Sequence, residues 1–154
     1  MPSTILYQRA TFVTQLPVGH LYSPSHCWLA RSEGGRWRVG FTKFALRMLG
    51  ELVDVQFETP PGTPVQPGDI VGSIEGFKAL SDLYCVGRGT FAGGNPALRD
   101  GLDGLARRPY DDGWLYEFDG EPDARCLPVE GYQQLLDVTI DRILEKQKAE
   151  ETTP

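Results

Sequence analysis

Short alternating stretches separated by turn-rich segments constrain the fold of this chain more than any other feature. Residues 36–41 (RWRVGF) and 113–118 (GWLYEF) carry large apolar side chains at every second position, the period of a half-buried strand. Residues 59–69 (TPPGTPVQPGD) are rich in turn-forming types and predict a loop. With 18 Gly and 12 Pro in 154 residues, the sequence predicts many short strands joined by turns.

Two helices are expected among these strands. Residues 43–49 follow Thr42, a good N-cap, carry apolar residues near helical spacing and end at Gly50. Residues 130–148 carry one apolar stripe, which predicts a helix docked on the core or on a partner. Strands are also expected at 52–58, 70–77, 82–86 and 90–95, and a linker is expected at 120–128. The tally favours a mainly β barrel or sandwich with short peripheral helices and a C-terminal helix.

Composition and missing motifs exclude several functions. The formal net charge is -6 and no basic stripe exists, so nucleic-acid binding is disfavoured. The sequence contains no apolar stretch long enough to span a membrane and no signal peptide, which favours a cytoplasmic protein. Cys27, Cys85 and Cys126 form no CxxC pair, and with only two histidines no metal site is expected. No nucleotide-binding or hydrolase motif is present.

Lys78 is the residue that most suggests chemistry. It lies between the strand-like runs 70–77 and 82–86, with Glu75 three positions before it and Asp82 four positions after it. The tip of a hairpin projects furthest from the core, so a lysine there can enter the active site of another protein. Attachment of an acyl cofactor needs an amine on a long flexible stem. On position alone, an ordinary solvated turn lysine is the simpler interpretation.

Five blocks of sequence, in order, resemble the lipoyl-carrying H protein of the glycine cleavage system. They are residues 21–28 (LYSPSHCW), 39–57 (VGFTKFALRMLGELVDVQF), 73–84 (SIEGFKALSDLY), 89–98 (GTFAGGNPAL) and 108–118 (RPYDDGWLYEF). The third block resembles the family's attachment hairpin and assigns the modified lysine to Lys78. The resemblance implies a lipoyl-domain-like barrel or sandwich of two antiparallel sheets.

The resemblance also implies a division of the chain. The lipoyl-carrier domain is expected over residues 20–128. An N-terminal extension (1–19) precedes it, and a C-terminal helix (129–148) and a flexible tail (149–154) follow it.

By this resemblance the chain is a non-catalytic carrier with lipoate bound covalently to Lys78. A lipoate-attaching ligase or transferase would install the arm. Glycine decarboxylase would load the arm with an aminomethyl group, aminomethyltransferase would unload it, and dihydrolipoyl dehydrogenase would reoxidise it. A tethered arm raises the effective concentration at each site. A carrier that visits several enzymes is expected to be a monomer.

Some positions depart from the family's pattern around the arm. The family usually has Glu where Cys27 stands, and often Asp followed by His or Tyr where Lys43 and Phe44 stand. The family's polar groups are thought to hold the cationic aminomethyl nitrogen, and Asp82 is the retained member. The expected surroundings of the arm are therefore Glu75, Asp82, Cys27 and Phe44.

Further departures are Gly76 in place of Ser, Leu102 in place of Pro and Ala106 in place of Asn. The departures keep two alternatives open. One is a lipoyl carrier repurposed for sulfur-compound oxidation or lipoyl relay, in which Cys27 or Cys85 exchanges with the lipoyl disulfide. The other is a non-lipoylated domain of the same fold.

Overall fold

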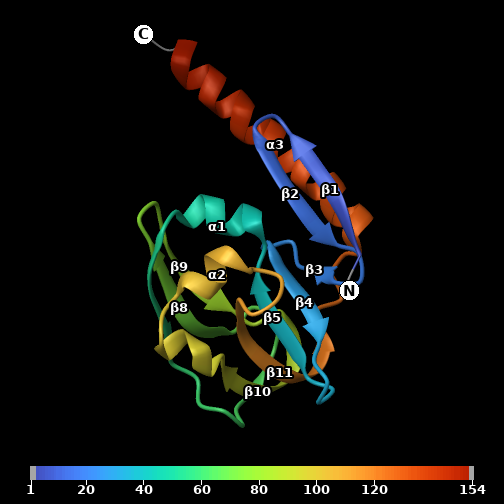
Figure 1. The fold of residues 1–154 in the computed structure, drawn as a ribbon, viewed down its shortest axis with the longest axis vertical. Coiled ribbons are helices and arrows are strands. Elements are labelled where there is room, and N and C mark those ends of the chain that lie inside the picture. Colours follow the sequence, from blue (N-terminus) through green and yellow to red (C-terminus); the bar gives the residue numbers. More distant parts are fainter. Residues whose placement is uncertain (1–2, 153–154) are drawn as a thin grey trace.

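The structure is a computed structural model and describes residues 3–152. Two antiparallel sheets form its body (Figure 1). The larger sheet has the strand order β3-β4-β5-β11-β10-β7, with bounds β3 (Leu21–Tyr22), β4 (Cys27–Arg31), β5 (Trp37–Phe41), β7 (Pro64–Val65), β10 (Gly87–Gly94) and β11 (Trp114–Pro122). The smaller sheet has the order β6-β8-β9, with bounds β6 (Leu52–Phe57), β8 (Ile70–Gly76) and β9 (Leu80–Tyr84).

The main hydrophobic core lies between these two sheets. The smaller sheet contributes Val71, Ile74 and Leu83, and the larger sheet contributes residues such as Leu115 and Phe118. Alternation puts Ile74 and Leu83 on the inner face, and the bulge between Ile70 and Gly72 brings Val71 to the core as well. Ser73, Glu75 and Asp82 lie on the outer face. The outer face of the β8–β9 hairpin is therefore available to solvent.

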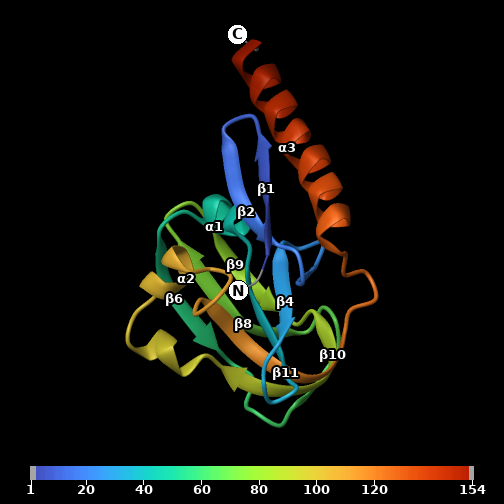
Figure 2. The ribbon, with the colours of Figure 1, turned by 45° about the vertical axis from the view of Figure 1, so that its right-hand side comes forward.

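The N-terminal residues form a separate two-stranded sheet of β1 (Thr4–Arg9) and β2 (Phe12–Pro17). This hairpin lies along the C-terminal helix α3 (Val129–Thr152), and both rise from the body side by side (Figures 1 and 2). A second core cluster joins them, and it includes Leu16, Tyr132 and Leu136, all fully buried. The two ends of the chain thus stabilise each other.

Three short helices complete the described part of the chain. Helix α1 (Lys43–Leu49) begins at the N-cap Thr42, whose hydroxyl accepts from the Ala45 N–H (3.3 Å). It ends at Gly50, which has φ 76° and whose N–H donates to the Leu46 carbonyl (3.0 Å). The other two are the 3-10 helix η1 (Pro96–Arg99) and α2 (Asp103–Arg107).

The predicted mainly β class, the short helices and the C-terminal helix are confirmed. Within residues 3–152 the sheets form no closed barrel, and there are three of them because the N-terminal hairpin forms a sheet of its own. The expected linker at 120–128 is partly wrong, since β11 continues through Pro122 against β10. The strand expected at 90–95 begins earlier, at Gly87. Its early part includes Gly89, which pairs directly with Gly120. The two glycines have φ 149° and 144°, and a side chain on either would collide with the opposite backbone.

Candidate functional site

Lys78 occupies the two-residue tip of the β8–β9 hairpin. Glu75 pairs with Leu80, and the Gly76 N–H donates to the Ala79 carbonyl (2.9 Å), so only Phe77 and Lys78 lie beyond the ladder. The Lys78 and Phe77 side chains are exposed. The hairpin tip rises beside α1 (Figure 1). The predicted hairpin is confirmed, with its second strand beginning at Leu80 rather than residue 82.

Backbone hydrogen bonds hold this tip against the end of α1. The Lys78 N–H donates to the Leu49 carbonyl and the Phe77 N–H donates to the Glu51 carbonyl, both at 2.9 Å. The contact is close enough to require glycine: a Cβ on Gly76 would lie 2.2 Å from the Leu49 oxygen. Lys78 Nζ lies 3.4 Å from the Arg47 carbonyl oxygen, at the carbonyl end of the helix. The backbone of the tip is thus fixed while the amine remains accessible.

The outer face of the smaller sheet is acidic next to this tip. Glu75 pairs with Asp54 on one side, and Asp82 pairs with Ser73 on the other strand. Residues two apart and cross-strand partners share a face, so Asp54, Glu75 and Asp82 lie on the same side. All three are exposed. The structure therefore brings the predicted Glu75 and Asp82 to one surface beside Lys78.

A groove of about 330 Å³ opens next to Lys78. Its walls come from α1, from the turn between β1 and β2, and from α3, and the Lys78 side chain lines it together with Phe44 and Met48. Arg47 closes one side, since its Nη2 donates to Thr11 Oγ1 (3.1 Å). Lys78 and Phe44, both predicted as site residues, therefore share this groove.

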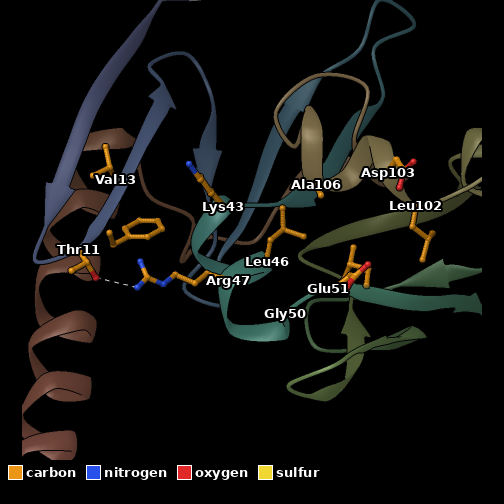
Figure 3. Close-up of a pocket in the computed structure, with 12 residues that line it drawn as sticks. Thr11, Val13, Lys43, Leu46, Arg47, Gly50, Glu51, Leu102, Asp103 and Ala106 are labelled. Atoms are coloured by element: carbon orange, nitrogen blue, oxygen red, sulfur yellow. Dashed lines mark hydrogen bonds between the residues drawn. The ribbon is translucent and has the colours of Figure 1, made fainter.

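A larger cavity of about 680 Å³, whose lining is drawn in Figure 3, adjoins the groove and shares Thr11, Phe12 and Arg47 with it. It is lined by α1, by the loop at Gly50 and by α2, and three of the departures from the family pattern meet there: Lys43, Leu102 and Ala106. The Lys43 side chain extends toward β2, and Leu46 points the opposite way (Figure 3). These three departures are far apart in the sequence, but they line the same cavity.

Cys27 does not lie with the other predicted site residues. Its side chain is 7% exposed and belongs to the main core, opposite Phe41 in the sheet. Burial raises the pKa of its thiol to about 12. Cys85 is also buried, with its pKa raised by desolvation. Thiol–disulfide exchange needs an accessible thiolate, which neither residue presents in this fold.

A buried polar network, which the sequence did not reveal, ties α1 to α3. The Tyr132 hydroxyl contacts Thr42 Oγ1 (2.8 Å) and His26 Nδ1 (2.9 Å). Thr42 Oγ1 donates to the His26 carbonyl (3.0 Å). Desolvation lowers the pKa of His26 to about 4, so its imidazole is neutral at pH 7. The network sets the position of α1, and α1 in turn holds the hairpin tip.

Two negative findings bear on other kinds of site. Within residues 3–152 no group of three or more His, Cys, Asp or Glu side chains could hold a metal ion. In the same part of the chain, no helix is long and apolar enough to cross a membrane.

An exposed lysine at the tip of a hairpin, on a mainly β body, is the arrangement that a carrier protein with a swinging arm requires. The comparisons agree: the model of the glycine cleavage H-protein family matches residues 20–130. The H protein of Corynebacterium jeikeium is 36% identical over 124 residues, which cover 79% of this chain and 97% of that protein. The H protein of Micrococcus luteus is 38% identical over 125 residues, covering 78% and 96%.

A solved structure gives the same result. The crystal structure of the H protein from Mycobacterium marinum superimposes with a TM-score of 0.67 and 32% identity, covering 76% of this chain and 95% of that one. The chain belongs to the glycine cleavage H-protein family. Proteins of this family are non-catalytic carriers of covalently attached lipoate that work with the glycine cleavage enzymes. The comparisons support that function and do not favour a repurposed carrier.

Proposed function

We propose that Lys78 bears the lipoyl group and that the chain carries an aminomethyl group and reducing equivalents between the enzymes of glycine cleavage. The observation that supports this most is the exposed lysine on a two-residue tip whose backbone is fixed against α1. A rigid base and a flexible stem suit an amine that must enter other active sites. When bound, lipoate supplies a disulfide that can accept the transferred group and be reduced.

The acidic face serves recognition in this proposal. Glu75 and Asp82 are exposed and share a face, while the Lys78 amine lies near the Arg47 carbonyl. Amide formation removes the lysine charge, so these carboxylates keep their charge for partners. A lipoate-attaching ligase or transferase, and the glycine cleavage enzymes, would meet them with basic surfaces, and the net charge of -6 favours such encounters.

The proposed partners are glycine decarboxylase, aminomethyltransferase and dihydrolipoyl dehydrogenase. The chain itself contributes the tether: each transfer becomes effectively intramolecular once the carrier has docked. We further propose that the carrier acts as a monomer, because one exposed tip must fit several different active sites in turn.

Mass spectrometry tests the attachment site. The protein is co-expressed with a lipoate ligase, and intact mass is measured for the wild type, Lys78→Arg and the matched control Lys43→Arg. We expect one lipoyl group on the wild type and on the control, and none on Lys78→Arg. An adduct that persists in Lys78→Arg, or no adduct on the wild type, would refute the assignment.

Glycine–bicarbonate exchange tests the pathway. The lipoylated protein is combined with the glycine decarboxylase of its own organism, and label exchange between bicarbonate and glycine is followed. Exchange is expected with lipoylated protein and not with Lys78→Arg. Fully lipoylated protein that supports no exchange would contradict the glycine cleavage function and leave the attachment site standing.

A further inference from the structure

Strand β2 presents an unpaired edge on the side away from β1. Within residues 3–152 its strand partner is β1 alone, and the Val18 N–H donates to the Ser3 carbonyl (2.9 Å) at the open end of the hairpin. Hydrogen-bonded and non-bonded pairs alternate along an antiparallel ladder. Counting from the Ser3–Val18 pair, Val13 and Gln15 belong to non-bonded pairs. Their backbone N–H and C=O groups therefore point away from β1.

This edge carries none of the usual devices that prevent another strand from pairing. In both views of the ribbon α3 lies on the β1 side of the hairpin, and the β2 side is open above α1 (Figures 1 and 2). Exposed edges are normally protected by charges, bulges or Pro. The hairpin has no bulge, and its outward-facing side chains are all uncharged: Thr4, Leu6, Gln8, Val13 and Gln15. The β2 edge can therefore accept an added strand.

The cavity of about 680 Å³ begins where this edge meets α1, since Val13 forms part of its lining. Lys43 and Arg47 lie on its hairpin side, and Glu51 and Asp103 lie toward α2 (Figure 3). All four are exposed, and in the part of the chain that the structure describes none of them forms an ion pair. The cavity thus has a positive end beside β2 and a negative end beside α2.

We propose that the β2 edge and this cavity together dock an extended segment of glycine decarboxylase, which adds as a third strand beside β2 and continues past Val13 into the cavity. The inference rests on the proposed function and names where this partner binds. Backbone hydrogen bonds hold the segment, as in other cases of strand addition. Charge sets its direction: an acidic side chain meets Lys43 and Arg47, and a basic one meets Glu51 and Asp103.

The position of this surface suits a partner that receives the arm. The cavity shares Thr11, Phe12 and Arg47 with the groove beside Lys78, so a protein docked here lies next to the attachment site. Glycine decarboxylase meets the arm as an uncharged disulfide, which offers no charge for recognition. Its recognition of the carrier therefore depends on the body of the protein, whereas the aminomethyl-loaded arm carries a cation that its next partner can bind.

Amide hydrogen exchange tests the added strand. Exchange is measured by residue-resolved mass spectrometry on the lipoylated full chain, with and without the glycine decarboxylase of its own organism. We expect the Val13 and Gln15 amides to exchange at least about tenfold more slowly in the complex. Leu6 and Gln8, whose N–H groups point off the β1 edge, are internal controls and should not change. A complex in which Val13 and Gln15 exchange as fast as in the free carrier would overturn the proposal.

Two matched prolines test the edge by affinity. Gln15→Pro removes an outward N–H from the β2 edge, and Gln8→Pro does the same on the β1 edge; edge strands tolerate Pro at such positions. The dissociation constant for glycine decarboxylase should rise about tenfold with Gln15→Pro and stay unchanged with Gln8→Pro. Equal effects of the two prolines, or none from Gln15→Pro, would contradict strand addition.

A charge reversal tests the cavity. Lys43→Glu should raise the same dissociation constant about threefold or more, and Lys148→Glu, at an exposed position near the end of α3, should not. Equal effects would refute the proposed polarity. A free carrier that is dimeric by sedimentation, with Val13 and Gln15 already protected, would assign the edge to a second copy and overturn the proposal. Absence of glycine–bicarbonate exchange with wild type would instead refute the proposed function.

Discussion

Gly76 offers a sharp test of how the lysine tip is held. Replacing it with Ala puts a Cβ 2.2 Å from the Leu49 oxygen, which also accepts the Lys78 N–H at 2.9 Å. The overlap is about 1 Å with backbone atoms, so the tip must move away from α1. Overpacking typically costs about 1–3 kcal/mol. Weakening the Lys78 and Phe77 backbone hydrogen bonds adds about 1 kcal/mol each at most.

We therefore expect Gly76→Ala to lower the free energy of unfolding by about 1–5 kcal/mol, measured by urea denaturation. Hydrogen exchange at the Phe77 and Lys78 amides should accelerate. The control is Gly104→Ala, where an added Cβ meets nothing within 4 Å and a helical position favours alanine by up to about 1 kcal/mol. If Gly76→Ala were as stable as Gly104→Ala, the close packing of the tip on α1 would be refuted.

Three further predictions concern the buried groups. The pKa of His26 is about 4 in the folded protein and about 6.5 in the unfolded chain. Between these pH values the unfolded state binds the proton more tightly than the folded state. About 3 kcal/mol of stability, present above pH 6.5, is therefore lost as the pH falls toward 4. Urea titrations of wild type and His26→Asn should show a steeper loss in the wild type. Tyr132→Phe removes the hydroxyl that contacts both Thr42 Oγ1 and His26 Nδ1 and should cost about 1–3 kcal/mol in the same assay; an unchanged midpoint would contradict the network. A thiol reagent should modify the half-buried Cys126 before Cys27, and peptide mapping that finds Cys27 labelled first would contradict its burial.

The site's main elements could be predicted because they depend on local sequence. Two alternating stretches with a short interval between them predict a hairpin, and the interval fixes Lys78 at its tip. Thr42 and Gly50 mark both ends of α1 by their capping chemistry. The family resemblance then predicted that this lysine, otherwise an ordinary turn residue, is an attachment site.

The N-terminal hairpin could not be predicted in the same way. Its turn is formed by Ala10 and Thr11, and Ala10 adopts φ 52°, a conformation that normally favours Gly, Asn or Asp. The usual turn signal is therefore missing.

The burial of Cys27 could not be predicted for a different reason. Three successive residues of β4 are buried, because Cys27 and Leu29 face the main core while Trp28 faces the second core cluster. Simple alternation of inside and outside fails there.

The same hairpin explains the most conspicuous departure near the arm. Phe44 stands where the family often has His or Tyr, which at first favours a different cargo. In this chain, however, Phe44 is 6% exposed and packs on Phe12 of β2 and on His26, with ring centroids 5.6 and 4.7 Å apart. An apolar ring at this position is what a buried contact with the added hairpin requires. The packing of Phe44 against the N-terminal hairpin therefore explains why an apolar ring stands at this position. Phe44 gives no separate reason to assign the arm a cargo other than the aminomethyl group.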